Sequence, residues 1–245
     1  MPGQNGKTVI VTGAASGIGF ACVQGLLAAG HCVCGADLQP FPAERLHDPA
    51  RFVEVRADIA DESDCRRIAE HAVKTFGALN AMIHMAALHS TSTWRELTAE
   101  HFDRTLTVNV TGSFLMARAA AEQMTSGGAI VLTSSGSINI GGVGGRGRGG
   151  PAYVASKAAI IGLTRALARS LAPIGIRVNA ISPGSTETPM TADYDDEMRR
   201  NVVARSLVGR MGRPEDIASV ALFLISDAAG YMTGEIVNVN GGGGG

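Results

Sequence analysis

The sequence predicts an α/β protein: a single-domain, doubly wound Rossmann fold with a central parallel sheet flanked by helices. Short apolar segments alternate with helical segments along all 245 residues, a glycine-rich turn follows the first apolar segment, and no linker divides the chain. Strands that alternate with helices form parallel sheets with right-handed crossovers. We therefore expect residues 1–245 to be one domain, with Gly241–Gly245 as a flexible tail.

The expected strands are apolar nearly throughout, which is typical of strands that are buried on both faces of a sheet. They are Lys7–Val11, His31–Ala36, Phe52–Arg56, Asn80–Met85, Ala129–Thr133, Arg177–Ile181 and Glu235–Asn240.

The expected helices fill the intervals between these strands. They are Gly17–Ala29, Glu62–Phe76, Ala99–Met124, Ala152–Leu171 and Pro214–Ser226. Two stretches interrupt the alternation. Gly141–Gly150 holds seven glycines and two arginines, and residues 183–213 form a long polar connection.

Composition excludes several classes of function. The formal net charge is -1, so no broad basic field favours nucleic acid. The chain has neither a long apolar run nor an N-terminal signal peptide, which predicts no membrane segment and a cytoplasmic location. The four cysteines lack the partners and spacing of a metal site, so we expect no metal and reduced thiols in the core.

The turn Thr12–Gly19 joins the first strand to the first helix and has the composition of a phosphate-binding loop. Glycines let the backbone approach a pyrophosphate, and a helix N-terminus offers free N–H groups and a positive dipole end. A glycine-rich turn alone is a weak signal, but here it lies in a strand–helix–strand unit that ends in an acid. The expected contacts are Gly13, Ser16, Gly17, Ile18 and Gly19.

Asp37 is that acid, and it follows Gly19 by 18 residues. A carboxylate at this position accepts hydrogen bonds from the adenosine ribose and repels a 2′-phosphate. Ser16 and Leu38 stand where a cation would be needed to bind that phosphate, so the sequence predicts NAD as the cofactor. The alternative is that Asp37 is an ordinary loop acid.

Asp58 and Ile59 follow the third strand, where the adenine is expected to lie. A second interpretation makes Asp58 a turn-forming residue without a ligand.

Tyr153 and Lys157 are four residues apart in an expected helix, so they share one face. A tyrosine has a reference pKa of about 10, and a nearby ammonium lowers it. The pair is therefore a candidate general acid/base unit. By itself such a pair is common on helix surfaces.

The order of the motifs resembles the classical short-chain dehydrogenase/reductase family from about Lys7 to Asn240, including the late segment Gly209–Ala218. The residues that carry the resemblance are Thr12–Gly19, Asp58, Asn109, Ser135, Tyr153, Lys157 and Pro183-Gly184.

This resemblance implies specific roles. Tyr153 would exchange a proton with the substrate oxygen, and Ser135 would hydrogen-bond that oxygen. Lys157 would lower the tyrosine pKa and bind the nicotinamide ribose. Asn109 would position a water in a proton relay through Lys157, and Thr188 would contact the nicotinamide carboxamide. The remaining cofactor contacts implied are Ala86, Pro183, Gly184 and Thr186.

The chain departs from the family pattern at three places. The usual Asn-Asn-Ala-Gly reads His84-Met85-Ala86-Ala87, and we expect His84 to be a strand-end residue rather than a catalyst. Thr186 replaces a branched aliphatic residue but still supplies a backbone N–H. Ser135 lies 18 residues before Tyr153, which is longer than usual, so Ser134 and Ser137 remain alternatives for the substrate-binding serine.

The predicted function is the NAD-dependent interconversion of a small-molecule secondary alcohol and a ketone. One alternative is a 3-oxoacyl-thioester reductase, which would prefer NADPH. Another is a non-catalytic NAD-binding regulatory protein, although such proteins usually lose the serine, tyrosine or lysine. The resemblance also implies a homotetramer that packs through Ala99–Met124, Ala152–Leu171 and the last strand.

Two segments are candidates for the substrate side. Residues 185–205 are expected to close over the site, with Met190, Tyr194, Met198 and Val202 as one stripe that covers either a substrate or the domain core. In Gly141–Gly150, Arg146 or Arg148 is expected to contact a polar or anionic group of the substrate. The alternative is that both arginines are solvated or touch a neighbouring subunit.

Overall fold

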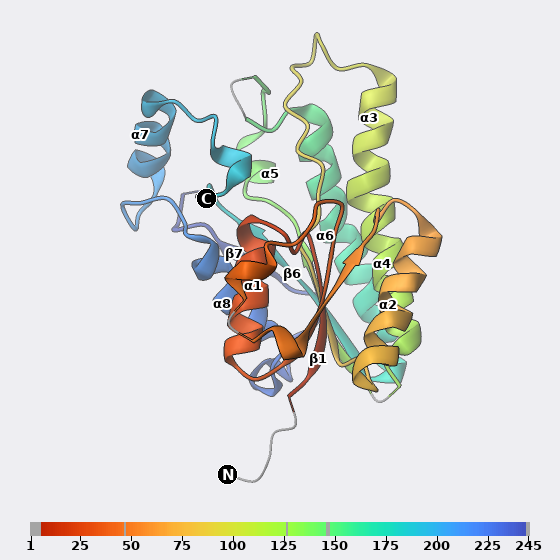
Figure 1. The fold of residues 1–245 in the computed structure, drawn as a ribbon. Helices are drawn as coiled ribbons and strands as arrows, with labels where there is room; N and C mark the ends of the chain where they lie inside the picture. Colours follow the sequence, from red (N-terminus) through yellow and green to blue (C-terminus); the bar gives the residue numbers. More distant parts are fainter. Residues whose placement is uncertain (1–5, 47, 126, 146–147, 244–245) are drawn as a thin grey trace.

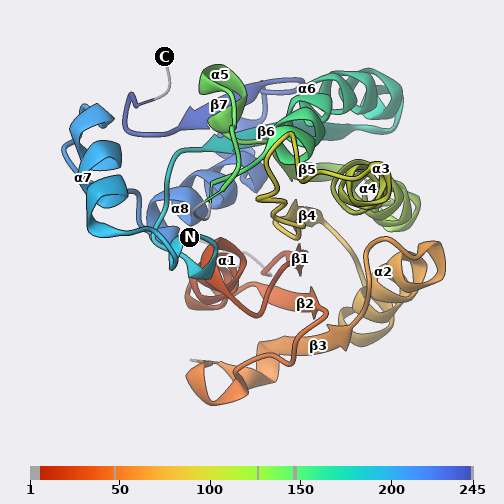
Figure 2. The ribbon, with the colours of Figure 1, turned by 90° about the horizontal axis from the view of Figure 1, so that it is seen from above.

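A seven-stranded parallel sheet forms the centre of the protein in the computed structural model, which describes residues 6–46, 48–125, 127–145 and 148–243. The strand order is β3-β2-β1-β4-β5-β6-β7, which Figure 2 shows from one sheet edge to the other. This arrangement confirms the predicted doubly wound fold. The strands are β1 (Thr8–Thr12), β2 (Cys32–Asp37), β3 (Phe52–Arg56), β4 (Ala81–His84), β5 (Gly128–Thr133), β6 (Ile176–Pro183) and β7 (Ile236–Val239).

Helices cover both faces of the sheet, as Figure 1 shows. One face carries α1 (Gly17–Ala28) and α8 (Pro214–Ile225), which pack on each other. The opposite face carries α2 (Glu62–Phe76), α4 (Gly112–Gln123) and α6 (Pro151–Leu171). Short 3-10 turns complete the connections at Ala43–Arg45, Pro49–Arg51, Ala172–Ile174, Pro189–Thr191 and Asp227–Ala229.

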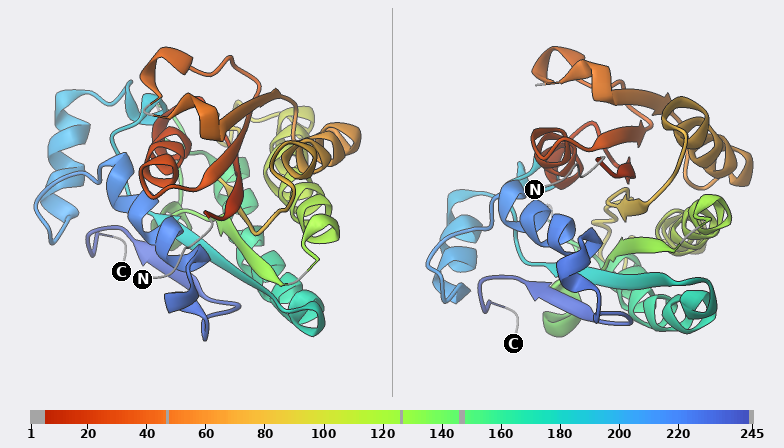
Figure 3. Two further views of the ribbon diagram at one scale, coloured as in Figure 1. Left: turned by 60° about the horizontal axis from the view of Figure 1, so that its bottom comes forward. Right: turned by 90° about the horizontal axis from the view of Figure 1, so that it is seen from below.

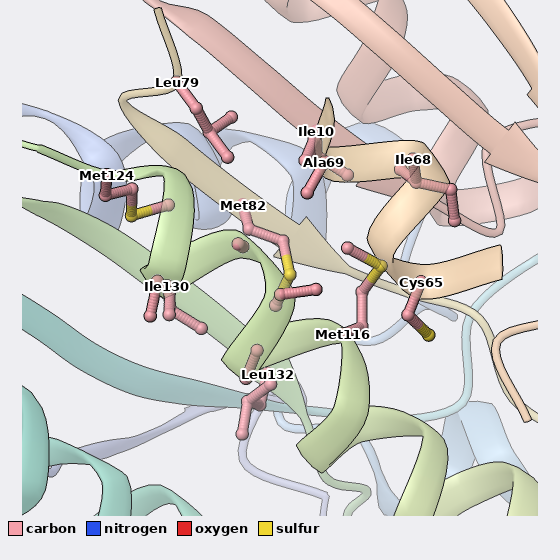
Figure 4. Close-up of a cluster of buried hydrophobic side chains, with 14 of the residues drawn as sticks. Ile10, Cys65, Ile68, Ala69, Leu79, Met82, Met116, Met124, Ile130 and Leu132 are labelled. Atoms are coloured by element: carbon pink, nitrogen blue, oxygen red, sulfur yellow. The ribbon is translucent and has the colours of Figure 1, made fainter. Parts of the chain in front are cut away.

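The sheet separates two apolar cores, one under each layer of helices. In Figure 4, Met82 and Ile130 of the sheet meet Met116 of α4 and Ile68 of α2, and all four side chains are fully buried. The second core joins Val9 and Val131 to Leu26 of α1 and Leu224 of α8. These two cores make the strand ends a fixed platform for a site.

Local signals in the sequence explain where helices begin and end. The Asp61 carboxylate accepts hydrogen bonds from the amides of Ser63 (2.7 Å) and Asp64 (3.0 Å) and so caps α2. Gly77 ends that helix with a left-handed φ of 83°, a conformation that glycine adopts without a steric penalty.

The expected helix Ala99–Met124 is instead three pieces. A π-helical segment, Thr107–Thr111, lies between α3 (Ala99–Leu106) and α4. Four of its five residues, all except Asn109, are β-branched, which weakens regular helix formation. Such π-bulges often occur at functional sites, and this one contains Asn109.

The long polar connection contains helical structure, which the expected helical stripe from Met190 to Val202 predicted only in part. Helix α7 spans Asp196–Arg205, and Asp195 caps it by accepting a hydrogen bond from the Met198 amide (2.8 Å). A short helix, α5, spans Ser137–Ile140. Both lie at the end of the sheet where the strands terminate (Figure 1).

The C-terminal end of the described chain returns to this connection. The Gly241 carbonyl accepts a hydrogen bond from the Leu207 amide (2.8 Å), and the Gly242 amide donates to the Asn240 side-chain oxygen (3.0 Å). The expected tail therefore begins in contact with the protein, while Gly244 and Gly245 lie outside the described residues. Figure 3 shows this end of the chain beside β7.

Among the described residues, no helix is both long and apolar enough to cross a membrane.

We expect Gly19→Ala to lower the free energy of unfolding by about 1–3 kcal/mol, because the new methyl group would overpack the first turn. A Cβ at Gly19 would lie 2.0 Å from the Gly13 carbonyl oxygen. Gly162→Ala in α6 is the control. It meets no atom within 4 Å and should stabilise the helix by about 0.5–1 kcal/mol. Urea unfolding measures both, and equal effects at the two glycines would contradict the packing argument.

Candidate active site

A cleft of about 980 Å³ lies at the carboxyl ends of the strands, beside the neighbouring strands β1 and β4. The chain after β1 leads to a helix on one face of the sheet, and the chain after β4 leads to helices on the other face. Ligands of open α/β sheets bind at this switch point. Of the predicted site residues, all but Asn109 line the cleft. Those that line it are Gly13, Ser16, Gly17, Ile18, Gly19, Asp37, Leu38, Asp58, Ile59, Ala86, Ser135, Tyr153, Lys157, Pro183, Gly184, Thr186 and Thr188.

The glycine-rich turn forms a backbone cradle at one end of the cleft. Gly13 and Gly17 have φ angles of 65° and 53°, which only glycine adopts readily. A Cβ at Gly13 would lie 2.8 Å from the Ala86 amide nitrogen. The hydroxyl of Ser16, the residue before α1, caps no amide of the described first turn. This cradle with its free helix N-terminus fits the pyrophosphate of a dinucleotide.

Asp37 lies at the end of β2 beside this cradle. Its carboxylate accepts hydrogen bonds from the amides of Ala15 (3.0 Å) and Gln39 (2.9 Å), one on each oxygen. Each oxygen keeps a further lone pair for a ligand. Arg56 lies opposite Asp37 on β3, but it donates to the Leu38 carbonyl (3.0 Å) and is not among the described residues that line the cleft.

Asp58 both forms a turn and pairs with a cation. One carboxylate oxygen accepts from the Ala60 amide at 2.9 Å, and the other lies 3.3 Å from the Arg104 guanidinium. Both alternatives for this residue thus have support, because Asp58 shapes its own turn and lines the cleft. Arg104 also lines the cleft, with its guanidinium facing Asp58.

The other end of the cleft holds Ser135, Tyr153 and Lys157. The side chain of Ser135 lies beside that of Tyr153, close enough to lower the pKa of the phenol by hydrogen bonding. The Lys157 Nζ donates to the Thr133 carbonyl at 2.9 Å and lies 5.7 Å from the centre of the Tyr153 ring. Tyr153 is 8% exposed and Lys157 is 2% exposed, so both reach the cleft from the core.

Burial dominates the titration of this pair. It raises the pKa of Tyr153 to about 12, against the lowering effect of the Ser135 hydrogen bond. Burial also lowers the pKa of Lys157 to about 8. Desolvation sets the raised pKa of Tyr153, and the Lys157 ammonium is directed at the Thr133 carbonyl. The lowering of the tyrosine pKa by Lys157 that the family resemblance implies stays a prediction.

The three candidate serines have different contacts. Ser135 is the one whose side chain acts on the Tyr153 phenol. The Ser134 hydroxyl donates to the Lys157 carbonyl at 2.9 Å and so anchors α6 to β5. The Ser137 amide donates to the Ser135 hydroxyl oxygen at 3.2 Å, which orients that hydroxyl. The geometry therefore favours Ser135 among the three.

Asn109 holds the backbone after β4 rather than contacting Lys157. Its side-chain oxygen accepts from the Leu88 amide (2.7 Å), and its amide nitrogen donates to the Leu88 carbonyl (3.0 Å) and the Ser156 hydroxyl (2.9 Å). Both amide hydrogens are thus used by protein groups. The implied water relay through Lys157 stays a prediction.

His89 is a cleft residue that the sequence reasoning missed. Its ring meets the Tyr153 ring edge-on, with centres 4.9 Å apart. Burial, and to a lesser degree the charge of Lys157, lowers the pKa of His89, so the ring is neutral near pH 7. The sequence feature that could have identified His89 is its position shortly after β4, since Ser135 follows β5 at the same edge of the sheet.

His84 has the structural position expected of it. It ends β4 inside the core, with its Nδ1 2.9 Å from the Thr12 hydroxyl. Burial lowers the pKa of its imidazole to about 3, so it carries no charge.

Two segments form the outer wall of the cleft. The stripe Met190, Tyr194, Met198 and Val202 faces the cleft, as the first of its two interpretations proposed. The glycine-rich loop packs against the chain after β4, since Gly145 donates to the Thr91 carbonyl (2.7 Å) and Gly150 to the Ser90 carbonyl (2.8 Å). Arg148 lines the cleft, whereas Arg146 lies outside the described residues.

In the described part of the chain, no group of three or more His, Cys, Asp or Glu side chains is placed to hold a metal ion. All four cysteines are free thiols. Cys22, Cys34 and Cys65 are buried in the core, which confirms their predicted place, and Cys32 is half-buried.

The fold and the site together define a dinucleotide-binding oxidoreductase. A family model described as Enoyl-(Acyl carrier protein) reductase matches residues 13–243. A 3alpha-hydroxysteroid dehydrogenase of Mediterraneibacter gnavus is 34% identical over 243 residues, 96% of each chain. The 3-oxoacyl-(acyl-carrier-protein) reductase FabG of Thermotoga maritima is 32% identical over 244 residues, 97% of each chain.

A solved structure gives the same result. A short-chain dehydrogenase/reductase, named as a glucose/ribitol dehydrogenase, from Brucella melitensis has a TM-score of 0.88 at 31% identity over 96% of each chain. The chain belongs to the short-chain dehydrogenase/reductase family, whose members use NAD(P). This membership confirms the resemblance seen in the sequence.

The buried lysine predicts how stability depends on pH. Lys157 has a pKa of about 8 in the folded protein, against 10.5 for an ordinary lysine. Between these pH values the unfolded chain binds a proton that the folded protein has released, so this residue's contribution to stability rises with pH. As the pH rises from about 7 to 10.5, we expect the free energy of unfolding of the wild type to increase by on the order of 3 kcal/mol more than that of Lys157→Met.

Urea unfolding of both proteins from about pH 7 to pH 10.5 measures this effect. The difference between the two proteins removes the contribution of other groups, such as the buried cysteines, that titrate in the same range. A difference that stays constant with pH would show that Lys157 is not held in a desolvated site.

Proposed function

We propose that the protein is an NAD-dependent oxidoreductase that interconverts a secondary alcohol and a ketone. The observation that carries the proposal is that Ser135, Tyr153 and buried Lys157 line one cleft, whose other end holds Asp37. A nucleotide site and a proton-transfer group thus share one cleft, as hydride transfer coupled to proton transfer requires.

The residues that would hold the cofactor fall into two groups. Gly13, Gly17 and Gly19 form the cradle for the pyrophosphate, and Asp37 accepts from the adenosine ribose. Lys157 and Thr188 would hold the nicotinamide half, beside Tyr153. When bound, NAD(H) supplies or accepts the hydride.

The proton chemistry belongs to the protein. A Tyr153 pKa of about 12 keeps the phenol protonated at neutral pH, ready to donate to a ketone oxygen. In the oxidation direction the same oxygen takes the proton from the alcohol, so oxidation gains from a rising pH. The Ser135 hydroxyl donates a hydrogen bond to the substrate oxygen and holds it against the tyrosine.

The preference for NAD rests on charge. Asp37 would lie close to a 2′-phosphate and repel it, because both groups are negative. Arg56, which lies opposite Asp37 on β3, donates to the Leu38 carbonyl, and Arg104 faces Asp58. This argument separates the proposal from a 3-oxoacyl-thioester reductase that uses NADPH, an activity named for one relative.

The homotetramer and the cytoplasmic location stay predictions of the sequence.

Tyr153→Phe should lower kcat/KM for alcohol oxidation by about 10²–10⁴-fold, because the general acid/base is removed. NADH absorbance measures turnover, and fluorescence titration with NADH should show that the cofactor still binds. Tyr231→Phe is the control. Tyr231 is fully exposed, so this substitution should leave turnover unchanged. Turnover by the Tyr153 variant at the wild-type rate would remove the proposed mechanism.

Asp37→Asn should raise the ratio of kcat/KM for NADP to that for NAD by at least about tenfold, because the repulsion between like charges is lost. The same kinetic assay is run with both cofactors. Asp103→Asn is the control, since Asp103 is exposed on α3 and does not line the cleft. A wild-type protein that uses NADP as well as NAD would contradict the proposal and favour the thioester reductase.

A further inference from the structure

Arg148 brings a positive charge to the substrate side of the cleft. It lines the cleft and follows the part of the glycine-rich loop that packs against Thr91. Its Nε and Nη2 atoms lie 3.4 Å from the carbonyl oxygens of Gly145 and Gly144, which are weak contacts. None of the ion pairs found among the described residues involves Arg148. Its charge is therefore left without an acidic partner in that part of the chain.

The backbone of Arg148 is held next to the reacting groups. The neighbouring residue, Gly149, packs on the Tyr153 ring so closely that an added Cβ would lie 2.6 Å from its Cδ1 atom. Gly150 is fixed by its hydrogen bond to the Ser90 carbonyl (2.8 Å). The wall of the cleft next to the Tyr153 ring therefore includes Arg148.

The charge of Arg148 reaches across the cleft. Burial raises the pKa of Tyr194, whose side chain hydrogen-bonds Ser185, and the positive charge of Arg148 opposes that rise. Tyr194 belongs to the stripe on the other wall. The guanidinium and the stripe thus face the same space.

The rest of this space is mostly apolar. Ile140 and Val143 line it from the glycine-rich loop side, and Met190, Met198 and Val202 line it from the stripe. Ile140 and Val143 are more than half exposed, so apolar surface reaches the mouth of the cleft. Polar side chains of α7 and the residue before it also line the cleft: Asp195 caps α7, Glu197 and a second cation, Arg205, are exposed on that helix, and Asn201 lies between them. An apolar body with one anionic group fits this lining.

We propose that the substrate is a secondary hydroxy acid with an apolar body, or its oxo acid, and that Arg148 binds the carboxylate. This inference rests on the proposed function, because it takes the reacting oxygen to lie at Ser135 and Tyr153. Arginine is suited to this role, since its planar guanidinium binds both oxygens of a carboxylate.

Binding tests the proposal without turnover. The probes are cyclohexanecarboxylate and the neutral cyclohexanecarboxamide, titrated by calorimetry into the protein saturated with NADH. We expect the carboxylate to bind at least about tenfold more tightly than the amide, and Arg148→Ala to reduce this ratio about 10- to 100-fold. Arg200→Ala is the matched control, because Arg200 is exposed on α7 and does not line the cleft. It should leave the ratio unchanged.

Two results would overturn the proposal. One is equal binding of carboxylate and amide to the wild type. The other is a carboxylate preference that survives in Arg148→Ala, which would assign the charge to another cation, such as Arg205.

Turnover of 4-hydroxycyclohexanecarboxylate and its methyl ester then separates the two proposals. If neutral alcohols are oxidised without any preference for the acid, the proposed function stands and the carboxylate site fails. If the carboxylate binds through Arg148 but none of a panel of hydroxy acids is oxidised with NAD, the carboxylate site stands and the proposed function fails.

Discussion

The close approach of backbones at the first turn is the constraint on which the rest of the site depends. Gly13 allows β1 to leave the sheet directly against Ala86 of the chain that follows β4, and Gly19 lets α1 begin against the Gly13 carbonyl. With a side chain at either position, the two segments would move apart. The cleft exists because the segments that follow β1 and β4 lead to opposite faces of the sheet. The glycines keep these two segments close together, so that backbone amides can reach a phosphate.

Desolvation is the second physical effect that shapes the site. The same burial that raises the pKa of Tyr153 lowers that of Lys157, so both groups are held closer to their neutral forms than they would be in water. Lys157 keeps one strong contact, to the Thr133 carbonyl. Removing the Tyr153 phenol and the Lys157 amine from water without a countercharge is unfavourable for folding. The packing of α6 on the sheet must therefore offset this cost.

Most of the fold and the cofactor end of the site could be predicted from the sequence, because they depend on local patterns. Apolar runs fix the strands, and Gly13, Gly17 and Asp37 lie at fixed offsets from strand ends. The π-helical segment at Asn109 could not be predicted, since the hydrogen bonds of Asn109 join it to Leu88 and Ser156, which are distant in sequence. His89 was missed for the same reason, because only tertiary packing brings it to Tyr153. The pKa of Tyr153 depends on burial, which spacing along a helix does not reveal.

The two ends of the cleft therefore differ in how strongly the fold determines them. The cofactor end is built from strand ends and a helix N-terminus, where a small change in backbone position disrupts binding. The substrate end is built from the glycine-rich loop, the stripe on α7 and the residues before it, and the chain after β4, all of which lie outside the sheet. Tyr153 and Lys157 are held on α6, which packs on the sheet, while the loops around them form the walls of the cleft. Arg148 and His89 both belong to these walls, so the proposed choice of substrate would depend on residues that the fold itself does not require.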